Sequence, residues 1–244
     1  MRIYGINPVL EALRAGRVTA LRVSARSDER HAEIARLAAS QGIPVRRANA
    51  GELDRFAQRG AHQGVVADVR DAEGLSVEEL VTSANGVPLI VVMDGIEDPH
   101  NVGAILRTVD AAGAHGVVRQ SRHAAPLAGS AAKASAGAVS HVRVAEVVNV
   151  ARALESLKEA GVWTVGLAGD SSVSYDSVDL TLPTALVVGA EGSGLRRLVK
   201  ERCDWVVSIP MAGHVQSLNV SVATGIALFE ALRQRRAKSA PPKA

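Results

Sequence analysis

Short apolar runs alternate with amphipathic segments along the whole of this 244-residue chain. A run such as Pro88–Met93 contains no charged or hydrogen-bonding side chain, which is typical of a strand buried on both faces of a sheet. A longer segment such as Asp28–Gln41 repeats apolar residues every three or four positions, which predicts a helix with one buried face. The alternation of strands and helices predicts an α/β fold with a mainly parallel sheet.

The same pattern locates the other elements. Further strands are predicted at Ala20–Val23, Pro44–Arg47, Val65–Val69, Val117–Val118, Val142–Val148, Val162–Leu167, Thr184–Val188 and Val206–Ile209. Further helices are predicted from Asn7, at Glu52–Arg59, from Asn101, and at Val150–Ala160, Leu195–Arg202 and Val220–Arg236.

Three local patterns make sharper predictions. Asn7 is predicted to cap the first helix, with Pro8 in its first position. In the last helix, spacing turns Ile226, Leu228, Phe229 and Leu232 largely inward. The segment Pro126–Ala138 is rich in Ala, Ser and Gly, which predicts close packing against another element.

Composition divides the chain into two domains. Residues 1–70 form a small α/β unit, and residues 71–86 are acidic and contain Gly and Ser, as expected of a linker. Residues 87–238 hold the remaining strands and helices and form the second domain. Residues 239–244 include two prolines and are predicted to be a disordered tail.

Charge is distributed unevenly although the net charge is only +3. Residues 1–70 hold twelve Arg, no Lys and seven Asp or Glu, which gives +5; the tail from Arg233 adds five basic residues and no acid, so residues 71–232 carry −7. Basic ends suit a polyanion such as RNA, although surface arginines can also be merely solvated. The candidate phosphate contacts are Arg14, Arg17, Arg22, Arg46, Arg47 and Arg59.

Other function classes find little support in the sequence. The single cysteine, Cys203, excludes an intrachain disulfide and a cysteine-cluster metal site, and it favours a cytoplasmic protein. The seven histidines show no metal-ligand spacing, so no metal is expected. Met1–Leu13 does not resemble a signal peptide, and no apolar run is long enough to span a membrane, so no membrane association is expected.

Three polar loops, each between an apolar strand and a helix, carry the candidate chemistry. They are Asp94–Arg107, Gly189–Leu195 and Ser208–Asn219. Loops that follow parallel strands meet at one edge of the sheet, which predicts one composite ligand site. The middle loop reads Gly-x-x-Gly-x-Gly, the reverse of the dinucleotide fingerprint, which argues against a nicotinamide-binding domain. Ser217 and Asn219 stand where a side chain can either cap a helix or face a ligand.

These loops resemble the three successive motifs of a known enzyme family. Asp94-Gly-Ile-Glu-Asp-Pro-His-Asn-Val-Gly-Ala-Ile-Leu-Arg107, Val188-Gly-Ala-Glu-Gly-Ser-Gly-Leu195 and Ile209–Asn219 are similar to those of the SpoU/TrmH-type SPOUT RNA 2′-O-ribose methyltransferases, most closely the RlmB type that methylates a guanosine of 23S rRNA. The resemblance implies an amino-terminal L30e-like RNA-binding domain. It also implies a carboxy-terminal α/β-knot domain whose deep trefoil knot holds S-adenosylmethionine, and a homodimer with the active site at the subunit interface.

The resemblance also implies which residues act. Its motif positions fall on Asn101, Arg107, Glu191, Ser217 and Asn219 as catalytic residues, and on Gly189, Ile209 and Leu218 as cofactor-binding residues. Arg107 would contact the RNA phosphate and assist deprotonation of the 2′-hydroxyl, while the other four catalytic residues orient it and the ribose. A guanidinium is normally fully protonated, so stabilisation of the developing alkoxide is the alternative role for Arg107.

Two other functions compete with this expectation. One is a transfer-RNA ribose methyltransferase, and the other is an inactive RNA-binding or ribosome-assembly protein of the same fold, against which the five intact catalytic positions argue. Aromatic residues make up only 2% of the chain, so RNA is expected to be recognised by shape and phosphate contacts more than by base stacking. The basic stretch Arg119–His123 is a further candidate substrate contact.

Overall fold

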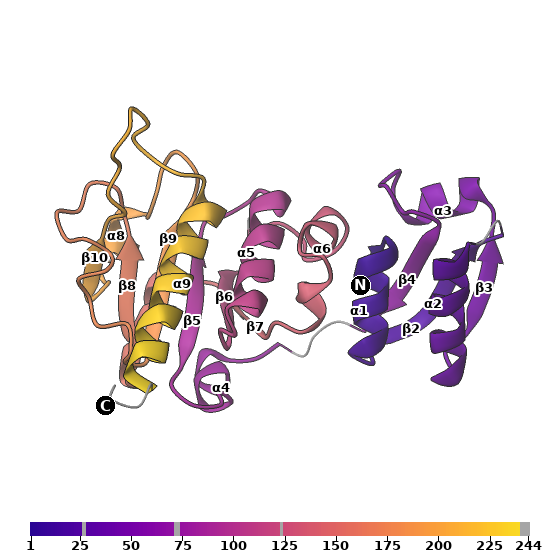
Figure 1. Cartoon of the computed structure of the whole chain (residues 1–244), viewed down its shortest axis with the longest axis horizontal. Coiled ribbons are helices and arrows are strands. Elements are labelled where there is room, and N and C mark those ends of the chain that lie inside the picture. Colours follow the sequence, from indigo (N-terminus) through magenta and orange to yellow (C-terminus); the bar gives the residue numbers. More distant parts are fainter. Residues whose placement is uncertain (26–27, 71–73, 123, 240–244) are drawn as a thin grey trace. The chain divides into compact units, whose positions relative to one another are not determined.

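The computed structural model describes residues 1–25, 28–70, 74–122 and 124–239, which form two compact units (Figure 1). The amino-terminal unit comprises Met1–Glu73, Pro99–Arg107 and Ala125–His141, and the sheet unit comprises Gly74–Asp98, Thr108–Ala124 and Val142–Ala244. Of the predicted disordered tail, Ser239 is the last residue of the final helix, and residues 240–244 lie outside the described residues.

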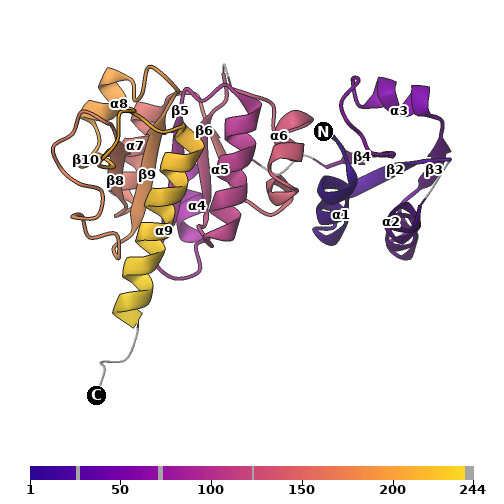
Figure 2. The ribbon, with the colours of Figure 1, turned by 45° about the horizontal axis from the view of Figure 1, so that its top comes forward.

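The amino-terminal unit is built on a four-stranded sheet in the order β1-β4-β2-β3. β4 pairs antiparallel with β1 and β2, and β2 pairs parallel with β3. Helices α1 and α2 lie on one face of this sheet and α3 on the other (Figure 2). The elements are β1 (Arg2–Tyr4), α1 (Ile6–Arg14), β2 (Val18–Ser24), α2 (Glu29–Ser40), β3 (Val45–Ala48), α3 (Ala50–Phe56) and β4 (Val65–Val69).

The predicted start of the first helix is wrong. Helix α1 begins at Ile6, and its N-cap is Gly5, whose φ of 98° is open to glycine but strained for other residues. The side-chain oxygen of Gln63 accepts a hydrogen bond from the Ile6 backbone N–H at 3.2 Å. This distant side chain therefore does the work predicted for Asn7, which lies inside the helix.

Close packing of the small-residue segment is confirmed. The segment folds into α6 (Ser130–Ala134) and a 3₁₀ turn (Ala138–Ser140), and α6 lies against Gly103 of α5 (Pro99–Ala111). A Cβ atom added to Gly103 would come within 3.0 Å of Ala134 and of the backbone of Ala131. Only glycine at this helix position leaves room for the neighbouring helix.

The sheet unit contains the predicted parallel sheet, which confirms the α/β fold class. Its six strands run in the order β10-β8-β9-β5-β6-β7, and all neighbouring strands are parallel. Its elements are α4 (Val77–Thr82), β5 (Leu89–Asp94), β6 (Gly116–Gln120), β7 (Val144–Val147), α7 (Val150–Glu159), β8 (Trp163–Leu167), β9 (Thr184–Gly189), α8 (Arg197–Glu201), β10 (Trp205–Val207) and α9 (Val220–Ser239), with the last turn of α5.

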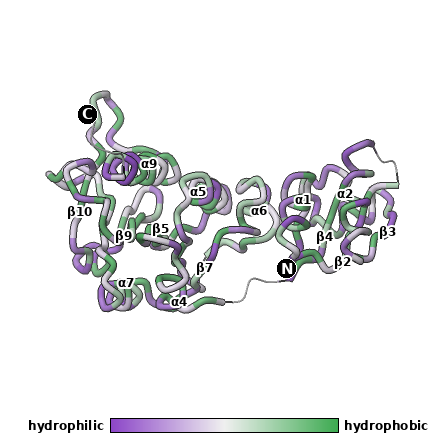
Figure 3. The backbone as a smooth tube through the Cα atoms, turned by 60° about the horizontal axis from the view of Figure 1, so that its bottom comes forward, coloured by the Kyte–Doolittle hydropathy of each residue, from purple (hydrophilic) through white to green (hydrophobic). Residues whose placement is uncertain are grey.

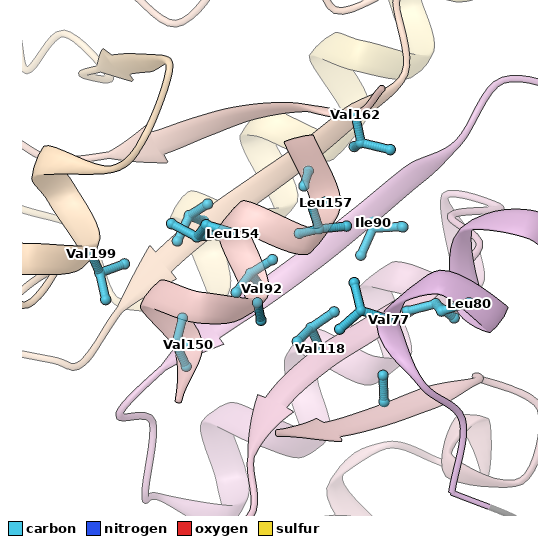
Figure 4. Close-up of a cluster of buried hydrophobic side chains, with 14 of the residues drawn as sticks. Val77, Leu80, Ile90, Val92, Val118, Val150, Leu154, Leu157, Val162 and Val199 are labelled. Carbon is cyan, nitrogen blue, oxygen red and sulfur yellow. The ribbon is translucent and has the colours of Figure 1, made fainter. Parts of the chain in front are cut away.

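Helices cover both faces of this sheet, with α4 and α7 on one side and α9 and the last turn of α5 on the other (Figure 3). The core under α4 and α7 joins buried aliphatic side chains of those helices to alternate residues of the strands (Figure 4). Val77 and Leu80 of α4 belong to this core, so the second half of the predicted linker packs into the sheet unit. All six residues of β5 are buried, as its uninterrupted apolar run predicts.

The last helix departs from prediction on one residue. Leu228 of α9 is fully buried, but the Phe229 side chain, predicted to face inward, is 50% exposed. Val222, two turns earlier on α9, is exposed to the same extent. Helix α9 therefore shows apolar side chains both toward the sheet and away from it.

Candidate active site

A cavity of about 870 Å³ opens at the carboxyl ends of β8, β9 and β10 in the sheet unit. This edge is where parallel α/β sheets bind ligands. After β7 at one edge of the sheet, the chain crosses to β8, which lies on the far side of β9. The loops that follow β8, β9 and β10 are therefore free to surround a ligand. The lining consists of residues 167–170, 188–195, 207–211 and 213–220, with Lys200 and Ala223.

The loop after β9 forms the floor of the cavity and depends on its glycines. A Cβ atom on Gly189 would come under 3.0 Å from the backbone of Gly194 and Leu195, so the two ends of the loop touch. The Gly194 N–H donates to the Ala190 carbonyl at 2.8 Å. Gly192 and Gly194 have φ values of 80° and 65°, which favour glycine. The predicted Gly-x-x-Gly-x-Gly turn is therefore a tight loop built around backbone contacts.

Asp94, the last residue of β5, ties this loop to the sheet. Its carboxylate accepts hydrogen bonds from the Arg196 backbone N–H at 2.9 Å and from Arg196 Nε at 2.7 Å. The terminal guanidinium nitrogen of Arg196 bonds the same carboxylate and also donates to Gln120 Oε1 at 3.0 Å. Asp94 is only 1% exposed, so this ion pair carries a buried charge.

The third loop joins β10 to α9 and closes the cavity. Asn219 Oδ1 accepts hydrogen bonds from the backbone N–H of Ser221 at 2.9 Å and from its hydroxyl at 2.6 Å. Asn219 therefore caps α9 while also lining the cavity. Ser217 is exposed and lines the cavity as well. Both alternatives that the sequence left open for Asn219, capping and facing a ligand, are compatible with this position.

The predicted residues divide into two groups. Six of the eight line the cavity, namely Gly189, Glu191, Ile209, Ser217, Leu218 and Asn219. Asn101 and Arg107 stand on α5 and are not among the described residues of its lining. Asn101 is buried, whereas Arg107 is exposed, away from the buried stripe of Val102, Ile105 and Val109, as its spacing predicts.

Sequence reasoning missed several residues of this region. Lys200 Nζ and the Asp170 carboxylate form an ion pair at 2.6 and 2.7 Å on the cavity wall, and the hydrogen bonds from Lys200 lower the pKa of Asp170. His214 also lines the cavity. The signal available for Asp94 was a carboxylate placed directly at the end of a wholly apolar run.

The basic stretch after β6 is partly buried. Arg119 is 5% exposed and lies 3.5 Å from Glu146, and burial lowers its pKa while Glu146 acts against that shift. A buried side chain is poorly placed to reach a large substrate. Of the predicted stretch Arg119–His123, His123 lies outside the described residues.

The cavity's chemistry is that of a binding site for a small organic molecule. Its volume falls in the usual range for ligand pockets, and it combines apolar walls with many backbone N–H and C=O groups. Among the described residues, no group of three or more His, Cys, Asp or Glu side chains is arranged to hold a metal ion. No helix within the described ranges has the length and apolar content needed to cross a membrane.

Comparison with known proteins assigns a family to both parts of the chain. Residues 88–229 match the SpoU rRNA Methylase family, and residues 2–75 match the family described as RNA 2′-O ribose methyltransferase substrate binding. Two relatives are both named 23S rRNA (guanosine-2′-O-)-methyltransferase RlmB. The protein from Pseudomonas syringae pv. tomato is 44% identical over 98% of both chains, and that from a Burkholderia species is 47% identical over 96% of both.

A solved structure agrees with these matches. The SpoU methyltransferase AviRb from Streptomyces viridochromogenes, crystallised in complex with the cofactor AdoMet, superposes with a TM-score of 0.82 at 27% identity, covering 97% of this chain and 91% of its own. The resemblance noted in the three loops is therefore confirmed. This chain belongs to the SpoU rRNA methylase family.

Proposed function

We propose that this chain is an S-adenosylmethionine-dependent enzyme that methylates the ribose 2′-hydroxyl of a guanosine in 23S rRNA. The observation that carries the proposal is the cavity at the ends of β8, β9 and β10, where the second and third family motifs meet. The proposal is also supported by the relatives named 23S rRNA (guanosine-2′-O-)-methyltransferase RlmB, which match the chain over nearly its full length.

The residues of the cavity fit the proposed cofactor. Leu167, Ile209 and Leu218 supply apolar walls suited to an adenine ring, and the tight glycine loop exposes backbone groups for polar contacts. Backbone atoms at Gly189, Ile209 and Leu218 are proposed to hold the cofactor. When bound, S-adenosylmethionine supplies an electrophilic methyl group.

The chain's own side chains are proposed to position and activate the ribose. Arg107 is exposed on α5 and contributes a permanent positive charge, because a guanidinium keeps its proton in proteins. It is proposed to contact the RNA phosphate and to donate hydrogen bonds to the oxygen as the 2′-hydroxyl loses its proton. One such donor is worth about 3 kcal/mol in a transition state. Asn101, Glu191, Ser217 and Asn219 are proposed to orient that arginine and the ribose.

The domain that contains residues 1–70 is proposed to bind RNA. Its candidate arginines are not equivalent: Arg22 bonds Asp68 at 2.5 Å and stacks on Phe56 at 4.0 Å, so it is held by its neighbours. Arg46 is the register partner of Arg22 on β3 and therefore shares its face of the sheet, but it is exposed. Arg46 and the exposed Arg59 are the better phosphate contacts.

A homodimer and a knot belong to the same proposal. The outward face of α9 at Val222 and Phe229 would be covered by a second copy, because half-exposed apolar side chains on a helix suit a protein interface. The segment Ile209–Asn219 leaves the edge strand β10 and reaches α9, which packs on β9, a path in keeping with the trefoil knot that the family resemblance implies. The proposed setting is the cytoplasm, where ribosomal RNA is processed.

The direct test is transfer of labelled methyl groups to 23S rRNA, followed by mapping of the modified nucleotide. Wild-type protein is expected to label one guanosine, and Arg107→Ala to lose about 10²–10³-fold in rate with unchanged cofactor binding. Arg152→Ala, which removes another exposed arginine from α7, is the matched control and should keep full activity. Labelling of transfer RNA in place of 23S rRNA would redirect the proposal, and equal activity of the two variants would remove Arg107 from it.

A second measurement tests the RNA-binding domain. Replacing Arg46 and Arg59 together by Ala should weaken RNA binding and lower the slope of log affinity against log salt by about one per lost phosphate contact. Arg36→Ala, on the exposed side of α2, is the control. An unchanged slope in the double variant would show that these two arginines are only solvated.

A further inference from the structure

Asp94 is connected to both ends of the cavity-lining loop between β9 and α8, through its backbone at one end and its side chain at the other. Asp94 is the register partner of Gly189, the residue from which the loop departs. Its carboxylate also holds Arg196, the residue at which the loop ends and α8 begins. Asp94 thus stands beside the start of residues 190–195 and bonds their end.

The bonds that Asp94 makes are strong and directional. Arg196 donates its backbone N–H to one carboxylate oxygen and its guanidinium to the other. The Asp94 side chain is fully shielded from solvent, whereas the Arg196 side chain is 52% exposed. A charge-assisted pair with one fully buried member is much less screened by salt than a surface pair. Gln120, at the end of β6, adds a further acceptor for the same guanidinium.

The middle of the loop is rich in glycine, whereas its end is also held by Leu195, which is 8% exposed and packs in the core. Gly192 and Gly194 adopt positive φ values, and the loop's one backbone bridge joins Ala190 to Gly194. Glycine-rich backbone has many conformations to lose when it is ordered. The tie at Arg196 therefore limits the conformations that are open to residues 190–194, which include Glu191.

We infer that Asp94 is a positioning residue that acts through Arg196 to hold the cofactor-binding loop in its binding conformation. This inference rests on the proposed function, because it assumes that the cavity takes S-adenosylmethionine. Asp94 itself is not among the described residues that line the cavity. Its effect is on the affinity for the cofactor and on the order of residues 190–195.

The test separates positioning from a merely structural ion pair. Asp94→Asn and Arg196→Met each leave a partner unsatisfied, so both should lower the melting temperature and weaken S-adenosylmethionine binding about tenfold or more. The double variant, Asp94→Asn with Arg196→Met, has no unpaired charge and should regain most of the melting temperature while keeping the weak binding. Arg196→Lys keeps the charge without the fork of donors and should fall between wild type and Arg196→Met.

A matched control is available in the same unit. Lys158 Nζ on α7 pairs with Asp204 at 2.9 Å, and Lys158→Met removes an ion pair without touching the cavity lining. This variant should lose stability but keep the wild-type affinity for the cofactor.

In steady-state assays, the Asp94 variants should raise KM for S-adenosylmethionine more than KM for RNA.

The readouts also distinguish this inference from the proposed function. Hydrogen exchange of the amides of residues 190–195 reports on the loop directly and needs neither RNA nor methyl transfer. Faster exchange in Asp94→Asn, with Lys158→Met unchanged, supports the positioning role even if wild-type protein bound no S-adenosylmethionine, a result that would refute the proposed function alone. Wild-type exchange and wild-type cofactor affinity in the double variant would overturn the role of Asp94.

Discussion

Replacement of Gly189 by alanine should damage the cofactor cavity without unfolding the protein. The added Cβ atom would lie under 3.0 Å from backbone atoms of Gly194 and Leu195, which cannot rotate aside as a side chain can. Overpacking of this kind costs about 1–3 kcal/mol. Retreat of the loop would also break the hydrogen bond from Gly194 to Ala190, worth about 1 kcal/mol. If about 2 kcal/mol of this total opposes binding, the affinity falls roughly 30-fold.

Calorimetric titration of S-adenosylmethionine into Gly189→Ala measures that loss. Gly74→Ala is the control, because Gly74 is not among the described residues that line the cavity and a Cβ atom there would meet nothing within 4 Å. The control should bind within about twofold of wild type. Wild-type affinity in Gly189→Ala would refute the reasoning, since it would mean that the loop moves away at no cost or that the cofactor does not touch it.

Three further predictions concern other parts of the molecule. Burial raises the pKa of the Cys203 thiol from 9.0 to about 12, so only about one in 10⁴ molecules carries the thiolate at pH 8 and alkylation should be about 10³-fold slower than for an exposed cysteine. The thiol ionises at a lower pH in the unfolded chain than in the folded protein. The contribution of Cys203 to the free energy of unfolding is therefore fully present below pH 9 and is lost as the pH rises toward 12. Denaturant titrations of wild type and Cys203→Ala over this pH range measure the loss. Gly103→Ala should lower the free energy of unfolding by about 1–3 kcal/mol, because α6 leaves no space for a methyl group. Phe229→Glu should convert the proposed dimer to a monomer in sedimentation experiments, whereas loss of stability with the mass unchanged would count against the α9 interface.

Much of the fold follows from local patterns in the sequence. The wholly apolar run before Asp94 predicts a central strand, because a parallel strand covered on both faces tolerates such a run. The loops after the strands could be expected to converge because the carboxyl ends of parallel strands share one edge. Residues of all three loops were therefore expected together; the cavity contains Gly189, Glu191, Ser217 and Asn219, whereas Asn101 and Arg107 are not among its described lining residues.

The errors arise where a distant residue replaces a local signal. Asn7 and Pro8 form a typical helix start, yet α1 begins one residue before Asn7 because Gln63, 57 positions after Ile6, supplies the missing acceptor. Strand β1 is three residues long and shows no alternation, so it is recognisable only through its pairing with β4, more than sixty positions later. The sequence around α1 and β1 contains neither Gln63 nor β4.

Phe229 shows a different limit. Helical spacing shows that one face of a helix is apolar and predicts that this face is buried. It does not show whether the same chain or another copy buries it. Helix α9 has apolar residues on two sides. Leu228 packs inside the unit, whereas Val222 and Phe229 are half exposed. The amphipathic pattern that marks most surface helices is therefore blurred, because α9 carries apolar residues on two faces.

Asp94 and Arg196 show why a site can be predicted in outline but not in its supporting contacts. Their side chains are hydrogen-bonded although the two residues lie 102 positions apart in the sequence. No residue next to either of them indicates the pairing. The physical constraint is nevertheless general: a carboxylate at the buried end of a strand must find donors, and the nearest unsatisfied N–H groups are those where the next loop along the sheet enters its helix. A charged residue that ends an apolar run therefore predicts a partner on the loop of the adjacent parallel strand. Here the adjacent strand is β9, whose loop carries Glu191 and the glycines of the cavity, so the residue that satisfies a buried charge also shapes the binding site.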